Sequence, residues 1–139
     1  MNTLLNNGAP LIDKPAVDLS ISWYIGNPAM IDLGDKILDG GIIIIARTSN
    51  TQGTPTAIKV RYAFCHEALQ VNDNLPGQLN TRSGALVCTL ATGTGQGPTR
   101  DHASPRQPIG GRYLAVWWET DGGQGGDQTD LKVWAQLVA

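Results

Sequence analysis

The last third of the chain contains two apolar segments that a polar, glycine-rich segment separates. Residues 111–119 (GRYLAVWWE) carry large apolar side chains at successive positions, and residues 131–138 (LKVWAQLV) form the second apolar segment. Residues 120–130 hold four glycines and three aspartates and are typical of a loop. Successive strand residues point to opposite faces, so the first segment predicts a strand that is apolar on both faces. Such a strand must be covered on both sides, by a second sheet or by a partner chain.

Five further segments predict strands in the rest of the chain. Residues 58–65 alternate apolar and polar side chains most regularly, and Lys59 and Arg61 should face solvent or a polar partner. Residues 42–48 begin with four consecutive isoleucines, which favour a strand that is central in a sheet or lies at an interface. The other three segments are residues 17–24, 30–33 and 85–91.

These segments alternate with turn clusters and show no convincing helical pattern. They predict an all-β fold, a single-domain β-sandwich or jelly roll with seven to eight strands and long loops rich in Gly and Pro. Residues 92–110, with four glycines and three prolines, should form the longest loop. Residues 1–15 predict an N-terminal arm, which either grips a neighbour or is frayed, and residues 16–139 predict the sandwich domain. A length of 139 residues suits one domain.

Charge and apolar patterning bear on the partners and the location of the protein. Charged residues make up 16% of the chain, below the usual ~25%, which suits a protein that hides surface in an assembly. The net charge is −2 and the basic residues are scattered, so we expect no nucleic-acid partner. No apolar run is long enough to span a bilayer, and residues 1–8 lack the pattern of a signal peptide. We therefore expect no membrane partner, and a protein that is made and used in the cytoplasm or released from it by lysis.

Two cysteines, Cys65 and Cys88, lie inside apolar segments. We expect reduced, buried thiols, although a disulfide between neighbouring strands stays open. Two cysteines and two histidines without ligand spacing predict no zinc site.

No group of residues predicts an active site, so we expect neither an enzyme nor a bound cofactor. Asp101, His102 and Ser104 have the residue types of a hydrolase triad, but triad members converge from separate parts of a fold. We interpret these three neighbours as a polar loop, and His66 as a strand-end residue.

Glycine-rich and acidic segments are the other candidates for binding chemistry. Residues 93–98 and 122–126 lack the lysine of a phosphate-binding loop and predict flexible loops. Aspartate oxygens could ligate calcium, but no EF-hand pattern is present. We therefore interpret two trios as solvated turns, namely Asp32, Asp35 and Asp39, and Asp121, Asp127 and Asp130.

The tryptophans are the side chains most able to anchor a contact, and there are four in a chain with one phenylalanine. Three roles stay open for them: core anchors, interface anchors, or a platform on which sugars stack. The two adjacent tryptophans must point to opposite faces of their strand. The sequence thus predicts seven interface candidates, which are Trp23, Tyr24, Trp117, Trp118, Trp134, Arg112 and Tyr113.

Two short motifs give the chain a likeness to a known family. Ile31-Asp32-Leu33-Gly34 precedes the long apolar strand, and Pro108-Ile109-Gly110-Gly111-Arg112-Tyr113-Leu114 opens the penultimate one. In this order the chain resembles, over residues 16–138, the small cement (decoration) proteins of tailed-phage capsids, and most closely the jelly-roll type of short-tailed phages. It departs from them in its tryptophan-rich last strands and in the long segment 92–110.

This resemblance implies a function for the chain as a whole. It implies a jelly-roll structural protein on the outer capsid surface of the virion, assembled in the cytoplasm of a bacterial host. The partners would be the major capsid protein, whose neighbouring capsomers it would bridge, and further copies of itself in a homodimer or homotrimer. The alternative is a carbohydrate- or receptor-binding β-sandwich module of a phage tail or fibre.

Overall fold

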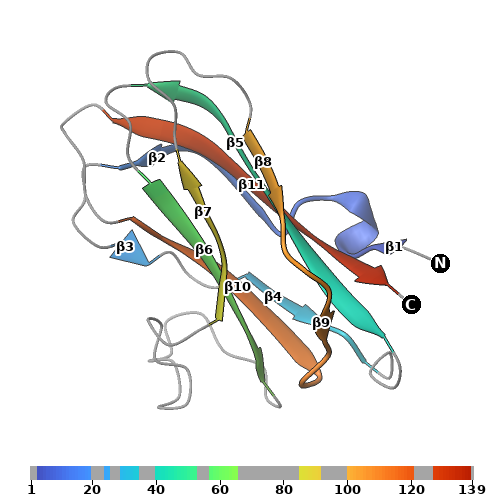
Figure 1. The fold of residues 1–139 in the computed structure, drawn as a ribbon. Helices are drawn as coiled ribbons and strands as arrows, with labels where there is room; N and C mark the ends of the chain where they lie inside the picture. The colour runs from blue at the N-terminus through green and yellow to red at the C-terminus, as the bar shows by residue number, and fades with distance from the viewer. Residues whose placement is uncertain are drawn as a thin grey trace.

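Two antiparallel sheets form the protein, which is almost entirely β in structure (Figure 1). The computed structural model describes residues 3–19, 24–25, 29–34, 40–52, 57–65, 85–91, 100–120 and 127–138. Within these residues the one helical element is a short 3-10 turn, η1 (Asn6–Gly8). The predicted all-β class is confirmed, and the two sheets pack as a sandwich.

Sheet A holds the two longest strands. They are β5 (Gly41–Gln52) and β11 (Gln128–Val138), which pair from Gln128 opposite Gln52 to Val138 opposite Gly41. The other edge of each is lined by shorter strands: β1 (Thr3–Leu4) and β2 (Ile12–Asp18) on β11, and β8 (Arg100–Ala103) and β9 (Gln107–Pro108) on β5. The isoleucine-rich strand is therefore central in its sheet, as predicted.

Sheet B is built around β10 and β6. Strand β10 (Tyr113–Thr120) pairs with β6 (Ala57–Cys65) at eight positions, from Tyr113 opposite Cys65 to Thr120 opposite Ile58. The remaining strands are β3 (Tyr24–Ile25) and β4 (Ala29–Asp32) on β10, and β7 (Ala85–Ala91) on β6. Three predicted strands, residues 30–33, 58–65 and 85–91, correspond to β4, β6 and β7 within one residue at each end.

Several short strands continue one another along a common neighbour, so each sheet has four rows. In sheet A, β1 and β2 share one edge of β11, and β8 and β9 share one edge of β5, which reduces six strands to four rows. In sheet B, β3 and β4 share one edge of β10, which reduces five strands to four rows. The described residues thus form eleven separate strands in eight rows, because edge rows are broken.

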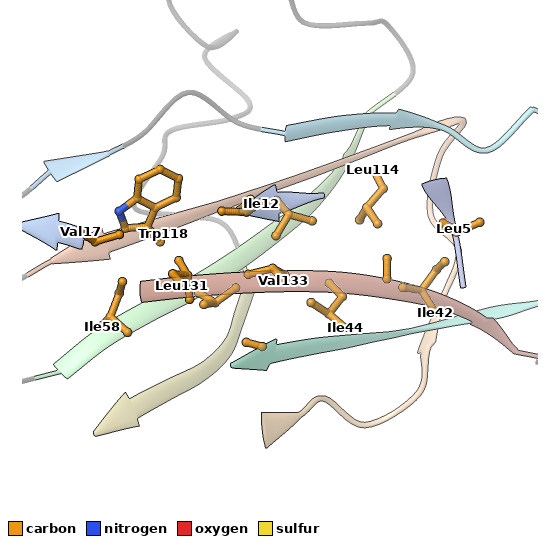
Figure 2. Packing of buried hydrophobic residues seen from close by; sticks show 14 of the residues in the cluster. Leu5, Ile12, Val17, Ile42, Ile44, Ile58, Leu114, Trp118, Leu131 and Val133 are labelled. Atoms are coloured by element: carbon orange, nitrogen blue, oxygen red, sulfur yellow. The ribbon is translucent and has the colours of Figure 1, made fainter. Parts of the chain in front are cut away.

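Apolar side chains from both sheets fill the space between them (Figure 2). In β5 and β11 every second residue faces this space, and opposite pairs such as Ile44 and Ala135 share one face. From the other sheet, Ile58, Val60, Leu114, Val116 and Trp118 join the same cluster. Full burial of a Leu or Ile side chain stabilises a fold by about 1.5–3 kcal/mol, so this alternation fixes the register of both sheets.

The chain contributes strands to sheet A from the first described residue, Thr3, onward. The sequence predicts an arm over residues 1–15, yet Thr3 lies opposite Leu137 and Ile12 lies opposite Val133, and Leu5 and Ile12 are buried in the core. The strand predicted over residues 17–24 is instead β2 (Ile12–Asp18) followed by the short β3. Alternation could not reveal β2, because only Ile12 and Val17 of its seven residues are buried.

The long loop predicted over residues 92–110 contains β8 and β9, which pair with β5. Between them, Ser104 is fixed to β5 by two hydrogen bonds: its N–H donates to Ile44 O over 2.8 Å, and Ile44 N–H donates to Ser104 Oγ over 2.9 Å. This part of the predicted loop is therefore the edge row of sheet A. Strand propensity did not predict this edge row, because glycine and proline are rare within strands.

The register keeps the two cysteines apart. Cys88 of β7 lies opposite Val60, whereas Cys65 is five positions further along β6. At a rise of about 3.3 Å per residue this separation is roughly 16 Å, beyond the ~7 Å that a disulfide spans between Cα atoms. The backbone positions of the two cysteines in this register are therefore too far apart for a disulfide. No helix in the described ranges is both long and apolar enough to cross a membrane.

Candidate interaction surface

The outer face of sheet A, away from the core, combines an apolar row with a charged row. The apolar row crosses three neighbouring strands: Trp134 of β11 lies opposite Ile45 of β5, which lies opposite Ala103 of β8. Trp134 and Ile45 are half-buried and Ala103 is exposed. Half-buried large side chains on a sheet face leave apolar area that a second surface can cover.

The charged row lies two positions along each strand from the apolar row. Across four strands it reads Asp13, Lys132, Arg47 and Asp101, each opposite the next in the register. Arg47 forms a two-point ion pair with Asp101, in which Nε donates to Oδ1 over 2.7 Å and Nη2 donates to Oδ2 over 3.1 Å. These hydrogen bonds lower the pKa of Asp101 and raise the pKa of Arg47.

Arg47 also connects the two rows. Its guanidinium lies over the Trp134 ring, 5.5 Å from the ring centroid, a distance at which a cation attracts an aromatic face. The guanidinium is thus oriented by a carboxylate on one strand and an indole on another. A side chain that is already held in one geometry loses little entropy on binding, which favours contact with a partner. We call Arg47, Asp101, Trp134, Ile45 and Lys132 the sheet A surface.

Two of the predicted interface tryptophans are not on the surface of the chain. Trp118 is 6% exposed and belongs to the core, and Trp117, on the opposite face of β10, is 0% exposed. The prediction that β10 is covered on both faces is confirmed by Ala115 and Trp117, both 0% exposed on the outer side. Because this burial occurs within the single chain, β10 does not require a partner to cover it.

The outer face of β10 also buries charge. Arg61 Nε lies 2.8 Å from Glu119 Oε1, and their side chains are only 18% and 4% exposed. Arg61 lies opposite Trp117 in the register, beside Glu119 two positions along β10. Arg61 was expected to face solvent or a polar partner, and Glu119 is that partner.

Two further candidates lie where β10 begins: Tyr113 is its first residue and Arg112 directly precedes it. Arg112 Nε and Nη2 donate to the two carboxylate oxygens of Asp32 over 3.0 Å each, and the guanidinium lies 5.4 Å from the centroid of the Tyr113 ring. Leu33 N–H donates to Arg112 O over 2.7 Å, and Gly34 N–H donates to Asp32 Oδ1 over 2.8 Å. These contacts connect the end of β4 to β10.

The last two candidates are Trp23 and Tyr24. Trp23 lies outside the described residues. Tyr24 belongs to β3 and is described by its backbone alone, which lies opposite Thr120 of β10. Trp134 is therefore the one predicted tryptophan that the described residues place on an accessible face.

The described residues that were considered for catalysis have separate structural contacts and form no common site. Asp101 binds Arg47, and Ser104 Oγ, which accepts from Ile44 N–H, donates to Pro105 O over 2.9 Å. His102 is exposed and lies opposite Ala46, in the row of the other face. His66 lies outside the described residues, as do both glycine-rich segments weighed for phosphate binding.

The aspartates weighed for calcium have protein partners where they are described. Asp32 binds Arg112, and Asp130 accepts from Ala16 N–H at Oδ1 and from Asn50 Nδ2 at Oδ2, both over 2.8 Å. Asp127 is buried, and Asp35, Asp39 and Asp121 lie outside the described residues. In the described part of the chain no three His, Cys, Asp or Glu side chains gather as a metal site.

Sequence reasoning missed four residues as parts of this surface, namely Ile45, Arg47, Asp101 and Lys132. The available signal was the isoleucine run itself, because four apolar residues in a row put two on each face of a strand. Ile43 and Ile45 are the outward pair. The partner Asp101 was concealed in a segment predicted to be a loop.

No protein-family model matches this sequence, and no curated protein is significantly similar to it. Fold and surface chemistry are thus the observations from which a function can be inferred.

Proposed function

We propose that the sandwich is a jelly roll. Numbered along the chain, the rows of sheet A have the order 1-8-3-6 and those of sheet B the order 2-7-4-5. The first and last rows are neighbours, and the chain passes repeatedly from one sheet to the other. This order supports a jelly roll, an architecture of eight strands in two sheets that occurs in viral capsid proteins and lectins.

We propose further that the protein is a capsid cement protein, which binds the outer surface of the major capsid shell and bridges neighbouring capsomers. The observation that carries this proposal is the sheet A surface, where a preoriented arginine and a half-buried tryptophan lie on a rigid sheet. Tryptophan and arginine are among the residue types most enriched among side chains that dominate binding energy. Because one fold can carry many different functions, the proposal depends on this site rather than on the fold.

The two motifs behind the family resemblance support the same proposal, because they form one structural unit. Asp32, Leu33 and Gly34 contact Arg112 or one another through the bonds described above, and Tyr113 lies under the guanidinium. Two motifs that are distant in sequence are thus joined in space by these contacts.

A cement protein stabilises a shell mechanically. Each copy adds a modest contact, and repetition of that contact over a closed shell turns weak binding into strong retention when one copy or one oligomer touches two capsomers. In this proposal the protein acts on the outside of the virion as a homodimer or homotrimer, with the major capsid protein as its partner. It needs no cofactor for this role.

The alternative, a carbohydrate- or receptor-binding module, receives less support from the geometry. Sugar stacking needs an open aromatic face. The guanidinium of Arg47 lies over the Trp134 ring, where a sugar would have to stack.

The test is to add the purified protein to heads that lack it. The expected result is saturable binding to the outer surface and a higher temperature or force for shell rupture. The variant Trp134→Thr should bind less, and His102→Ala, an exposed change in the row of the other face, should bind as the unaltered protein does. Heads that neither bind the protein nor gain strength would rule out this function.

A further inference from the structure

Two cations lie at the centre of the sheet A surface, and only one of them forms an ion pair within the described residues. Lys132 and Arg47 lie directly opposite each other on β11 and β5. Like charges in opposite positions of a sheet repel. Arg47 is balanced by Asp101, whereas the exposed Lys132 has no ion pair within the described residues.

The acidic neighbours of Lys132 do not supply that missing partner. Asp130, whose pKa the Lys132 charge helps to lower, already uses both carboxylate oxygens, one for Ala16 N–H and one for Asn50 Nδ2. Asp13 lies opposite Lys132 in the register, but among the described residues it forms no ion pair with it. The ammonium group of Lys132 is therefore available to an external acceptor.

Arg47 also keeps donors for an external acceptor. A guanidinium carries five N–H groups. Asp101 accepts from Nε and from one N–H of Nη2, which leaves three. The stack on Trp134 and the two bonds to Asp101 hold these remaining donors in a fixed place beside Lys132.

The apolar row begins two residues away along the same strands. Ile45 is separated from Arg47 by this step on β5, and Trp134 is separated from Lys132 by the same step on β11. Two residues of a strand rise about 7 Å. The Arg47 guanidinium lies over the Trp134 ring, so an apolar group on this row would contact Ile45, whose backbone position is about 7 Å along β5 from that of Arg47.

We propose that the partner presents a carboxylate side chain to Lys132 and Arg47 and, one strand step of about 7 Å along, an apolar side chain to Ile45. This inference rests on the proposed function, and it specifies the patch on the major capsid protein that the sheet A surface binds. An Asp or Glu two positions from an apolar residue in an extended segment has this spacing.

The charges at both ends of the row favour a single carboxylate over an extended polyanion. Asp13 and Asp101 flank the two cations. A nucleic-acid backbone or an anionic membrane laid across the row would bring negative charge against both aspartates, whereas one side chain can enter between them. Electrostatic contacts of this kind set specificity and the rate of association.

The experiment measures binding of purified protein to heads that lack it, between about 50 and 500 mM NaCl, with charge variants on β11 and β2. Lys132→Glu should lower affinity roughly tenfold or more at low salt. Lys132→Met should lower it less and flatten the salt dependence, because it removes the charge and keeps the aliphatic stem. Asp13→Asn, the matched control, should bind as well as the unaltered protein or better. Since the introduced glutamate would face Arg47, the fold should tolerate the charge reversal, which thermal unfolding checks.

The outcomes separate this inference from the proposed function. If the unaltered protein binds heads, but Lys132→Glu binds equally well at every salt concentration, the carboxylate contact is wrong and the cement function stands. If the reversal changes self-association in light scattering and leaves head binding unaltered, the surface binds a second copy and the inference is overturned. If no protein binds, the function itself fails.

Discussion

Arg112 donates two hydrogen bonds of 3.0 Å to the carboxylate oxygens of Asp32, a residue 80 positions earlier in the chain. The pair crosses from β10 to the end of β4, where Tyr113 lies opposite Asp32. The Arg112 guanidinium, which donates these bonds, and Gly34 N–H hold the pKa of Asp32 below its usual value of 3.8. The pair thus joins residues 31–34 to residues 108–114.

Because both side chains of this pair are about half exposed, its contribution to stability should be small and sensitive to salt. Arg112→Gln should lower the urea midpoint slightly at about 20 mM NaCl and not measurably at about 1 M NaCl. A double-mutant cycle with Asp32→Asn isolates the pair. A coupling that persists unchanged at the higher salt concentration would contradict an exposed ion pair.

Ala16 adopts a left-handed backbone, with φ 51°, within β2. This conformation strains residues that carry a Cβ, whereas glycine adopts it freely. Ala16→Gly should therefore stabilise the protein by about 0.5–1 kcal/mol in urea unfolding. Ala63→Gly in β6, where φ is ordinary, is the matched control and should destabilise by about as much. Equal loss in both variants would show that Ala16 is not strained.

Asp130 of β11 binds an irregular position in each of the two strands that flank β11, Ala16 in β2 and Asn50 in β5. Its carboxylate accepts from Asn50 Nδ2 and from Ala16 N–H, which lower its pKa below 3.8, and both donor residues have positive φ. A folded pKa below the unfolded one gives stability that is complete above the unfolded value and is lost as pH falls through the folded value. Asp130→Asn should cost about 1–2 kcal/mol at neutral pH and reduce the loss of stability on acidification.

The control for this pH profile is Asp13→Asn, an exposed change on β2. It should leave both the midpoint at neutral pH and the acid limb nearly as they are. If the stability of Asp130→Asn falls on acidification in the same way as that of the unaltered protein, the pH dependence comes from other carboxylates.

Two buried threonines of β5 should respond in opposite ways to the same substitution. Thr48 is 0% exposed and its hydroxyl has no hydrogen-bond partner among the described residues, whereas Thr51 Oγ1 lies 2.9 Å from Thr129 Oγ1. A buried, unpaired hydroxyl is costly. Thr48→Val should stabilise by about 1 kcal/mol and Thr51→Val should destabilise by about 1 kcal/mol in thermal or urea unfolding. Two changes of the same sign would refute this assignment.

Sequence alone predicted the strands whose own residues are mainly apolar, both the central strands β5 and β6 and the edge strands β4 and β7. Strand β5 has four isoleucines and β6 alternates regularly, so apolar burial dominates both and the prediction succeeds. Strand β2 pairs on one edge only and buries two of its seven residues, so its sequence shows no period. Strands β8 and β9 interrupt a Gly/Pro-rich segment, and only their pairing with β5 defines them.

The surface was harder to predict than the core for a related reason. Alternation showed that Trp117 and Trp118 face opposite ways, but it could not show that the chain buries both. Trp134 was a candidate, yet its partner Arg47 became visible only through the register of β11 with β5. Contacts across strands depend on tertiary pairing, which no local pattern contains.

The most direct measurement is cryo-electron microscopy of heads with and without the protein. We expect extra density on the outside of the shell, at junctions between capsomers, into which the two-sheet sandwich fits with Trp134 and Arg47 toward the major capsid protein. Absence of such density from heads that were incubated with saturating protein, or density confined to a tail or fibre, would contradict a role as shell cement.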